Sequence, residues 1–338
     1  MRRARKKTNY SSFAEKSRPV LLVVSGLMLV IITACYWTQH DSVAGMTVWP
    51  VWVWALPGFL AAEYGWSKRR WLLTLLLSIA WLAVVTGFGD ARGFLNNKEW
   101  PSEEWQIAKD HNDAIRVVTV NCGAGNDKAA AEVDEYTPDI VLFQESPAKQ
   151  CVSSIARKLY KHKAAVVWTN DTAIIARGRI LSSQNKDSWL TESRIRLTTG
   201  REVVVMDVHL SPVAFRTDVW KSEYWKYMSH MRRVHRHEME YVKERIDQLA
   251  DSAPVILGGD FNSPAGDAIF HAISPKLRDA FRDGGKGWGC TLPNSIPLIR
   301  IDQVWTNDHF YAAAVIAERT DDSDHRMVIC DLLMRAGN

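Results

Sequence analysis

Polar side chains suited to a divalent cation and a reactive water follow several short apolar segments of this 338-residue chain. Asn121 ends RVVTVN, Glu145 ends IVLFQE, His209 ends VVVMDVH, and PVILGGDFN contains Asp260 and ends at Asn262. Segments rich in β-branched residues predict strands, and strands that end in carboxylates, amides and imidazoles at one edge can form a site for a hard cation. A cation in such a site could support phosphoester hydrolysis.

The segment from Gly258 to Asn262 carries two of these groups close together. Its glycines allow the chain to turn, and Asp260 and Asn262, two residues apart, would point the same way from an extended backbone. A carboxylate beside an amide suits water activation and oxyanion donation. Taken alone, the segment is better explained by an Asx turn, because Asp and Asn favour turns. Taken with the other groups, it favours a catalytic role.

An acid and an imidazole are predicted to pair near the end of the chain. Asp302 lies inside the apolar segment RIDQVW, where a charge is costly unless it has a partner. The tripeptide Ser323-Asp324-His325 precedes the last predicted strand, which makes His325 the natural partner. Asp324 would then offer an oxygen to a metal ion beside that imidazole.

Each remaining group has a simpler explanation when it is taken alone. The tripeptide SDH could be a surface turn, Asn121 and Glu145 could cap helices, and His209 could be a structural histidine. The chemical interpretation therefore depends on the combination.

The hydrophobic pattern from Ile115 onward predicts ten strands that alternate with helices. The strands are expected at residues 116–120, 139–143, 164–168, 172–176, 195–198, 202–210, 254–258, 301–305, 312–317 and 327–333. Helices are expected at residues 128–136, 147–161 and 219–249, with a short one after Pro264. This pattern predicts an α/β fold with enough strands for two sheets.

The first third of the chain differs from the rest in charge and hydropathy. Residues 1–98 carry 12 Lys or Arg against 4 Asp or Glu, a net charge of +8, and the remaining residues carry 30 against 34, a net charge of −4. Three apolar segments, residues 20–37, 48–62 and 71–88, have about the length that crosses a bilayer, although Pro50 and Pro57 interrupt the second. We expect all three to span; buried helices of a soluble domain, or a lipoprotein signal ending at Cys35, are the alternatives.

The placement of Lys and Arg predicts the orientation. Basic residues precede the first apolar segment and recur at residues 68–70, so both places should stay in the cytoplasm. We therefore expect a basic cytoplasmic tail (1–18), a three-helix membrane anchor (19–89), a linker (90–113) and a catalytic domain outside the cytoplasm (114–338). In an exported domain Cys122, Cys151, Cys290 and Cys330 could pair, although buried free thiols are the favoured interpretation.

The ordered series Asn, QE, HL, GDFN, ID and SDH resembles the endonuclease/exonuclease/phosphatase superfamily, the DNase I-like fold, over about residues 115–334. The resemblance implies a four-layered α/β sandwich of two mixed sheets, with the site at one edge. It also implies Mg²⁺ or Mn²⁺ as the cofactor, with Glu145 as the main ligand and Asn121 and Asp324 close to the ion or its waters.

The same resemblance implies the remaining roles. Asp260 would orient or deprotonate the attacking water, and Asn262 would hold the phosphate or the nucleophile. His209 and His325 would contact the phosphoryl oxygens, and Asp302 would fix the tautomer of His325. Asn121-Cys122-Gly123 lacks the acid that abasic-site endonucleases carry two residues after this Asn, and they place Tyr where His209 stands, which argues against that specific activity.

Three functions remain open at this point. The first is a membrane-anchored phosphodiesterase of nuclease type, whose substrate could lie along the basic residues of the helix expected at 219–249, although a solvated helix face is the favoured explanation of those residues. The second is a phosphatase or phosphodiesterase that acts on a lipid head group or a small molecule, and the third is a catalytically silent binding module. The lipid bilayer is the expected partner, and no protein partner is indicated.

Overall fold

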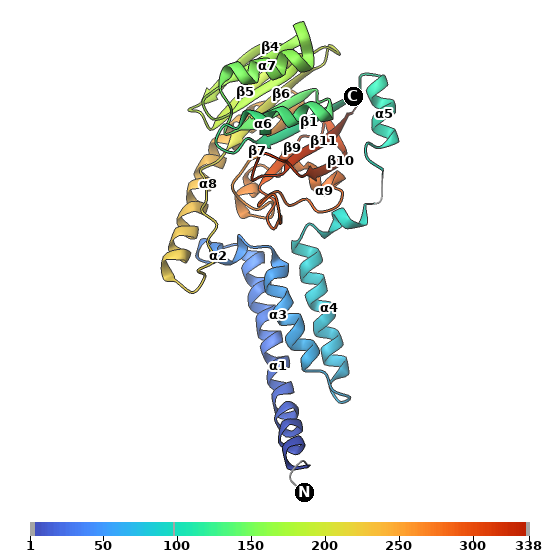
Figure 1. The fold of residues 1–338 in the computed structure, drawn as a ribbon, viewed down its shortest axis with the longest axis vertical. Helices are drawn as coiled ribbons and strands as arrows, with labels where there is room; N and C mark the ends of the chain where they lie inside the picture. Colours follow the sequence, from blue (N-terminus) through green and yellow to red (C-terminus); the bar gives the residue numbers. More distant parts are fainter. Residues whose placement is uncertain (1–3, 97–98, 336–338) are drawn as a thin grey trace. The chain divides into compact units, whose positions relative to one another are not determined.

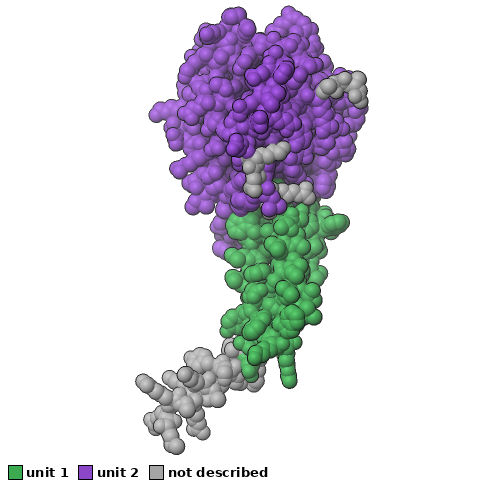
Figure 2. Space-filling view, turned by 90° about the vertical axis from the view of Figure 1, so that its right-hand side faces the viewer, with its two compact units in different colours: residues 1–91 green, residues 92–338 purple. Residues whose placement is uncertain are grey.

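The computed structural model describes residues 4–96 and 99–335. Contacts divide the chain into two units, Met1–Ala91 (unit 1) and Arg92–Asn338 (unit 2), which Figure 2 shows in separate colours. The two units are described separately.

Unit 1 is helical. It contains α1 (Ala4–Thr38), the short 3-10 helix η1 (Asp41–Val43), α2 (Ala44–Thr47), α3 (Val51–Tyr64) and α4 (Trp71–Phe88). Two stretches, Ser17–Thr38 and Trp71–Phe88, are long and apolar enough to cross a membrane. The predicted middle span, residues 48–62, falls mostly on the 14-residue α3, which passes as a span only together with the preceding helical segment Asp41–Thr47, bent by 74° from it. A third span exists only if this pair is counted as one.

The bend in the middle segment has a local cause. Pro50 lies between the two helices at the N-cap of α3, and it cannot donate a backbone hydrogen bond to a preceding turn. Hydrogen bonds at small residues of α1 and α3 join these helices to each other and to α4. Ser25 Oγ donates to the Gly58 carbonyl at 2.7 Å, and Trp81 Nε1 donates to Ser25 Oγ at 3.0 Å. A Cβ at Gly58 would lie 2.1 Å from the Trp81 ring, so this position accepts only glycine without rearrangement.

Unit 2 is built on a mixed sheet of eleven strands (Figure 1). The strands are β1 (Ala114–Asn121), β2 (Ile140–Gln144), β3 (Ala164–Trp168), β4 (Ala173–Lys186), β5 (Leu190–Leu197), β6 (Glu202–His209), β7 (Val255–Asp260), β8 (Arg278–Asp279), β9 (Asp302–Thr306), β10 (Phe310–Glu318) and β11 (Met327–Met334). Their order is β10-β11-β1-β2-β4-β5-β6-β7-β9-β8, and β3 pairs with β4. All ten predicted strands are present, and the two-residue β8 was not predicted.

The strands form one hydrogen-bonded path that curls, rather than the two separate sheets that were expected. The reason is β4, whose first part pairs with β2 and β3 and whose second part pairs with β5. A Cβ at Gly178, between these parts, would lie 2.3 Å from the Arg196 carbonyl oxygen, and a register shift follows between Ile180 and Ser182. Bulges and glycines bend strands in this way.

The curl brings apolar faces of the two halves together. Val117 and Leu142 from one half and Val205 and Ile256 from the other belong to a single buried cluster. The outward faces are covered by helices: α6 (Asp127–Ala131) and α7 (Lys149–Tyr160) pack on the β1–β2 half, and α8 (Ser222–Leu249) packs on the β6–β7 half. Shorter helices complete the unit: η2 (Ala91–Leu95), whose first residue is the last of unit 1, α5 (Glu103–Asp110), η3 (Glu132–Tyr136), η4 (Lys161–Lys163), η5 (Ala268–Ala272) and α9 (Ala280–Gly284).

The predicted linker, residues 90–113, contains a helix that packs on the sheet. Ser102 caps α5 by accepting a hydrogen bond from the Trp105 amide at 3.2 Å. The buried Trp105 ring covers the Arg116 guanidinium at 4.4 Å, and that group donates to both Asp331 oxygens, at 2.6 and 2.9 Å. The sequence of this segment is short and polar, so the helix α5 was not predicted. A single aromatic residue, Trp105, packs it against the sheet.

We predict that Asp331→Ala destabilises the protein by about 3–5 kcal/mol, because it leaves the buried Arg116 charge without the carboxylate that pairs with it. Asp331 is fully buried in its pair with Arg116. The measurement is chemical denaturation of the detergent-solubilised protein, followed by a spectroscopic signal that reports the tertiary structure of unit 2.

The matched control is Asp113→Ala, which breaks the exposed ion pair with Arg201. Its expected cost is at most about 1 kcal/mol. Equal losses for the two variants would contradict the assignment of Arg116–Asp331 as a structural pair.

Candidate active site

The candidate site forms where strand ends from both halves of the sheet meet. β1 and β2 are parallel, with Asn121 in register with Gln144, and β6 and β7 are parallel, with His209 in register with Asp260. Asp260 is also in register with Asp302, the first residue of the antiparallel strand β9. The carboxyl ends of neighbouring parallel strands lie on one edge, which is where α/β sheets bind ligands.

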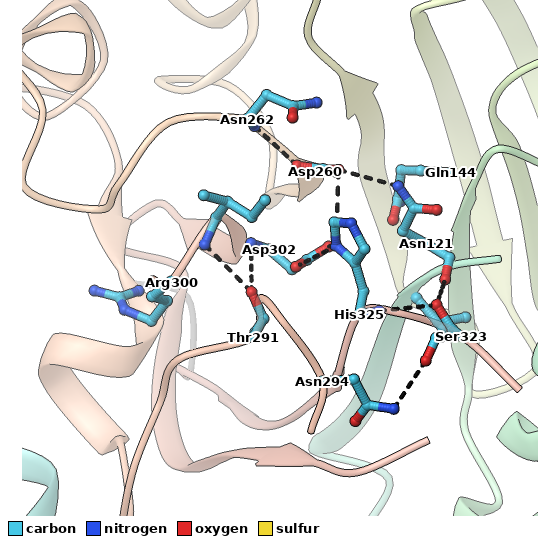
Figure 3. A network of polar contacts seen from close by, with 12 residues as sticks. Asn121, Gln144, Asp260, Asn262, Thr291, Asn294, Arg300, Asp302, Ser323 and His325 are labelled. Carbon is cyan, nitrogen blue, oxygen red and sulfur yellow. Dashed lines mark hydrogen bonds and ion pairs between the residues drawn. The ribbon is translucent and has the colours of Figure 1, made fainter. Parts of the chain in front are cut away.

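Asp260 lies at the centre of this site. Its Oδ2 accepts a hydrogen bond from Asn121 Nδ2 at 3.0 Å and lies 3.9 Å from His209 Nε2 and 3.8 Å from His325 Nδ1. Figure 3 shows its contacts with Asn121 and His325. Burial, helped by the charge of Asp302, raises the pKa of Asp260 above its ordinary value, and the two imidazoles act in the opposite direction.

His325 lies against two carboxylates, as the sequence predicted for Asp302. Its Nδ1 is 3.0 Å from Asp302 Oδ2 and 3.2 Å from Oδ1, so Nδ1 carries the proton and donates it. Burial alone would lower the pKa of His325, but Asp302, Asp260 and Asp324 together raise it to about 10. The Asp302 contact occupies Nδ1 and leaves Nε2 as the nitrogen that a substrate could meet.

His209 has its own carboxylate, which the sequence analysis missed. Its Nδ1 lies 2.9 Å from Oδ1 of Asp171, in the loop between β3 and β4. Burial lowers the pKa of His209, but the hydrogen bond to Asp171 and the charge of Asp260 raise it, and the net direction is upward. Asp171 sits in a turn-like Asn-Asp sequence, and no local pattern distinguishes it from an ordinary turn residue.

Glu145 and Asn121 are linked through the loop that follows β1. Glu145 Oε1 accepts from Asn121 Nδ2 at 3.3 Å, and Glu145 Oε2 accepts from the Ala124 amide at 2.5 Å. Glu145 has a positive φ of 46°, a backbone conformation that non-glycine residues adopt rarely and that concentrates at functional sites. The loop therefore fixes the Glu145 carboxylate beside the end of β1.

Asp324 borders the same loop. Its Oδ1 lies 3.4 Å from the position of a Cβ at Gly123, and Ser323 Oγ donates to the Asn121 carbonyl at 2.7 Å. The tripeptide is thus joined to the end of β1 and places an exposed carboxylate next to it.

Asn262 is close to Asp260 and makes two hydrogen bonds within the protein. Its backbone amide donates to Asp260 Oδ1 at 2.8 Å, and its side-chain Nδ2 donates to the Leu210 carbonyl at 3.0 Å. The amide group therefore ties the end of β7 to the residue after His209. A contact between Asn262 and phosphate stays a prediction.

The two glycines before Asp260 allow the strands to approach closely. Gly259 has a φ of 135°, and a Cβ there would lie 2.0 Å from the Val208 carbonyl oxygen. A Cβ at Gly258 would lie 2.7 Å from Leu142, on the other half of the sheet. Side chains at these positions would push the strand ends apart.

A series of buried hydrogen bonds between polar side chains lies beside the site. Thr119 Oγ1 donates to Gln144 Oε1 at 3.2 Å, and Gln144 Nε2 donates to Asp207 Oδ1 at 2.6 Å. Burial raises the pKa of Asp207 well above its ordinary value, while the hydrogen bond from Gln144 acts in the opposite direction. Gln144 belongs to the QE motif, but no role was predicted for it or for Asp207, because each lies within an apolar strand sequence beside a more conspicuous residue.

The donor set fits a hard divalent cation, which prefers oxygen ligands. Asp260, Asp302 and His325 have ligand atoms within 4.8 Å of one another, but the His325–Asp302 hydrogen bond already uses two of these groups. Within the part of the chain that the structure describes, Glu145 and Asp324 make no ion pair, so their charges are available to a cation. With the Asn121 amide they form the better candidate ligand set.

Comparisons with known proteins place this architecture. No curated protein matches the sequence. Solved structures that resemble it include a Bacteroides thetaiotaomicron endonuclease/exonuclease/phosphatase family protein, at 15% identity and TM-score 0.52, covering 66% of this chain and 98% of that chain. Another, from Beutenbergia cavernae, has 18% identity and TM-score 0.53 and covers 66% and 72%. At such identities the likeness concerns the fold.

The sequence itself also matches a family profile. The profile of the Endonuclease/Exonuclease/phosphatase family matches residues 118–325, which contain every residue of the candidate site. The curled mixed sheet agrees with the DNase I-like α/β fold of that family. This chain therefore belongs to the Endonuclease/Exonuclease/phosphatase family.

Proposed function

We propose that the protein is a membrane-anchored, divalent-metal-dependent phosphoester hydrolase, and that it acts as a phosphodiesterase of endonuclease or exonuclease type. The observation that carries the proposal is the convergence on Asp260 of two imidazoles, each with its own carboxylate, and one amide. Family membership supports phosphoester hydrolysis. A silent binding module would not require so many costly buried charges.

Asp260 would act as the general base. Its raised pKa brings it nearer to the pH at which it must take a proton from water, which is the condition for efficient base catalysis. His209 and His325 would donate hydrogen bonds to the phosphoryl oxygens and stabilise the charge that develops on them. Asp171 and Asp302 would keep both rings oriented and protonated.

Glu145, Asn121 and Asp324 would hold Mg²⁺ or Mn²⁺. The bound ion would neutralise charge on the phosphoryl group. Asn121 would contribute both to the ion site and to the orientation of the general base, because its Nδ2 also donates to Asp260 Oδ2 at 3.0 Å. Ion binding and base orientation would then depend on one side chain.

A second candidate is a hydrolase of lipid head groups or small phosphorylated molecules on the same fold. The observation that favours it is the pair of apolar helical stretches, Ser17–Thr38 and Trp71–Phe88, which would keep the enzyme at a bilayer. In either case we propose that the N-terminus lies in the cytoplasm and the catalytic unit outside it, from the placement of the basic residues.

We expect the full-length protein in detergent to hydrolyse at least one phosphodiester, and Asp260→Asn to lower the turnover by about 10²–10⁴-fold, because the amide cannot accept the proton. The substrate panel is plasmid DNA, RNA, a phosphoinositide, sphingomyelin and bis-nitrophenyl phosphate, each with Mg²⁺. Nicked plasmid or shortened RNA supports the nuclease, and release from lipid alone supports the second candidate.

Asp251→Asn serves as the control, since Asp251 is an exposed carboxylate paired with Lys276 and should leave turnover unchanged. Near-wild-type turnover of a folded Asp260→Asn protein would overturn the assignment of the base.

We also expect a divalent ion to raise the thermal midpoint of the protein, because binding to the folded state stabilises it. Glu145→Gln should remove most of this shift and raise the Mg²⁺ concentration needed for activity. The measurement is thermal unfolding with chelator, Mg²⁺ or Mn²⁺. Glu202→Gln, at a partly exposed ion pair with Arg196, is the control. An unchanged ion-induced shift in Glu145→Gln would exclude Glu145 as the main ligand.

The topology is tested with a fluorescent protein that matures only in the cytoplasm. Fused after Asn338 in a bacterial host, it should stay dark, because three spans, with Asp41–Thr47 and Val51–Tyr64 counted as one, would export the C-terminus. The same reporter fused after Arg70, following the second predicted segment, should fluoresce. A bright C-terminal fusion would show that the catalytic unit is cytoplasmic.

A further inference from the structure

Unit 2 exposes a small cluster of large apolar side chains that its hydrophobic core does not use. Leu95 is 81% exposed, Ile296 69%, Phe94 56% and Trp288 37%. We call these four residues the apolar surface. Single exposed apolar residues are ordinary, but a contiguous group that includes aromatic rings marks a binding surface.

Contacts join the two segments that carry these residues: Phe94 meets Trp288, and Leu95 and Ile296 are chain neighbours of Phe94 and Pro297. The rings of Phe94 and Trp288 lie 5.5 Å apart between centroids. Trp288 Nε1 donates to the Pro297 carbonyl at 2.7 Å, which places the indole beside the residue that follows Ile296. The Gly287 amide donates to the Gly93 carbonyl at 2.8 Å, so the two segments are also held together by their backbones. The surface is therefore built from two segments distant in sequence.

The chain itself restricts where this surface can be. α4, one of the two helical stretches apolar enough to cross a membrane, ends at Phe88, and Phe94 follows six residues later. Six extended residues span at most about 20 Å. The apolar surface is thus tethered within a short distance of the point where α4 would leave the bilayer.

We propose that the apolar surface docks on the lipid bilayer that α4 enters, with Leu95 and Ile296 inserted at the level of the head groups. Trp side chains favour this interfacial region, and Phe and Leu are typical of the apolar face that interfacial segments bury. Transfer of aliphatic side chains out of water lowers the free energy. The proposal rests on the membrane anchor and goes beyond the proposed hydrolysis, since it does not depend on any catalytic residue.

Docking at this surface would place the catalytic site next to the bilayer. The loop that carries Trp288 and Ile296 also supports the site: Thr291 Oγ1 accepts from the Asp302 amide at 3.2 Å, and Asn294 Nδ2 donates to the Ser323 carbonyl at 2.8 Å. The Asn294 amide also donates to the Asp324 carbonyl at 2.7 Å. Figure 3 shows Thr291 and Asn294 beside Asp302 and Ser323. One loop thus joins the docking surface to the acid–imidazole pair.

The test is photo-crosslinking of the full-length protein in nanodiscs of phosphatidylcholine and phosphatidylglycerol. Benzoylphenylalanine is placed at Ile296, or in a separate protein at Leu95, and adducts are identified by mass spectrometry after illumination. The control position is Asn185, exposed at the far end of β4. We expect phospholipid adducts at positions 296 and 95 several-fold more often than at 185.

A variant strengthens the test. Ile296→Asp, combined with the crosslinker at Leu95, should reduce the lipid adducts, because a charge at the interface opposes insertion, while hydrolysis of a soluble phosphodiester should be unchanged. Adducts no more frequent at 296 and 95 than at 185, or adducts to a second copy of the chain instead of lipid, would overturn the proposal. If the unsubstituted protein hydrolyses none of the substrates, the proposed function is overturned, whereas the crosslinking result still tests the docking proposal.

Discussion

The cost of burying the Asp260 carboxylate governs the arrangement of the whole site. A charge in a low-dielectric environment persists only where donors or opposite charges face it. Around Asp260 these come from the Asn121 amide, the Asn262 backbone and the two imidazoles, which lie on β1, after β7, on β6 and before β11. The imidazoles in turn require Asp171 and Asp302 to hold them. The curl of the sheet matters because it brings these separate strands to one carboxylate.

Much of this arrangement could be predicted because its parts follow simple local rules. Alternating and β-branched segments located all ten predicted strands, and an acid within an apolar strand required a partner, which pointed to His325 for Asp302. The register of neighbouring parallel strands then brought Asn121 beside Glu145 and His209 beside Asp260. These are consequences of strand geometry that a sequence pattern carries.

The parts that were missed depend on distant contacts. Asp171 becomes the partner of His209 only because the β3–β4 loop crosses the end of β6, and nothing in its own neighbourhood encodes that crossing. The 14-residue β4 continues well past its apolar half, so hydropathy revealed only its first residues. The helix α5 has one buried aromatic residue, too few for a hydrophobic period. In unit 1 the length of apolar sequence predicted a span at residues 48–62, whereas α3 begins only after Pro50 and is bent by 74° from the helical segment before it.

Gly259 has a consequence for how closely the reacting groups can be brought together. Gly259 has no side chain, so the Val208 carbonyl oxygen can lie where it would be only 2.0 Å from a Cβ. Val208 precedes His209, and Gly259 precedes Asp260. The absence of a side chain at Gly259 therefore limits the distance between His209 and Asp260. Even alanine would act as a wedge between β6 and β7, spreading imidazole and carboxylate without altering either of them.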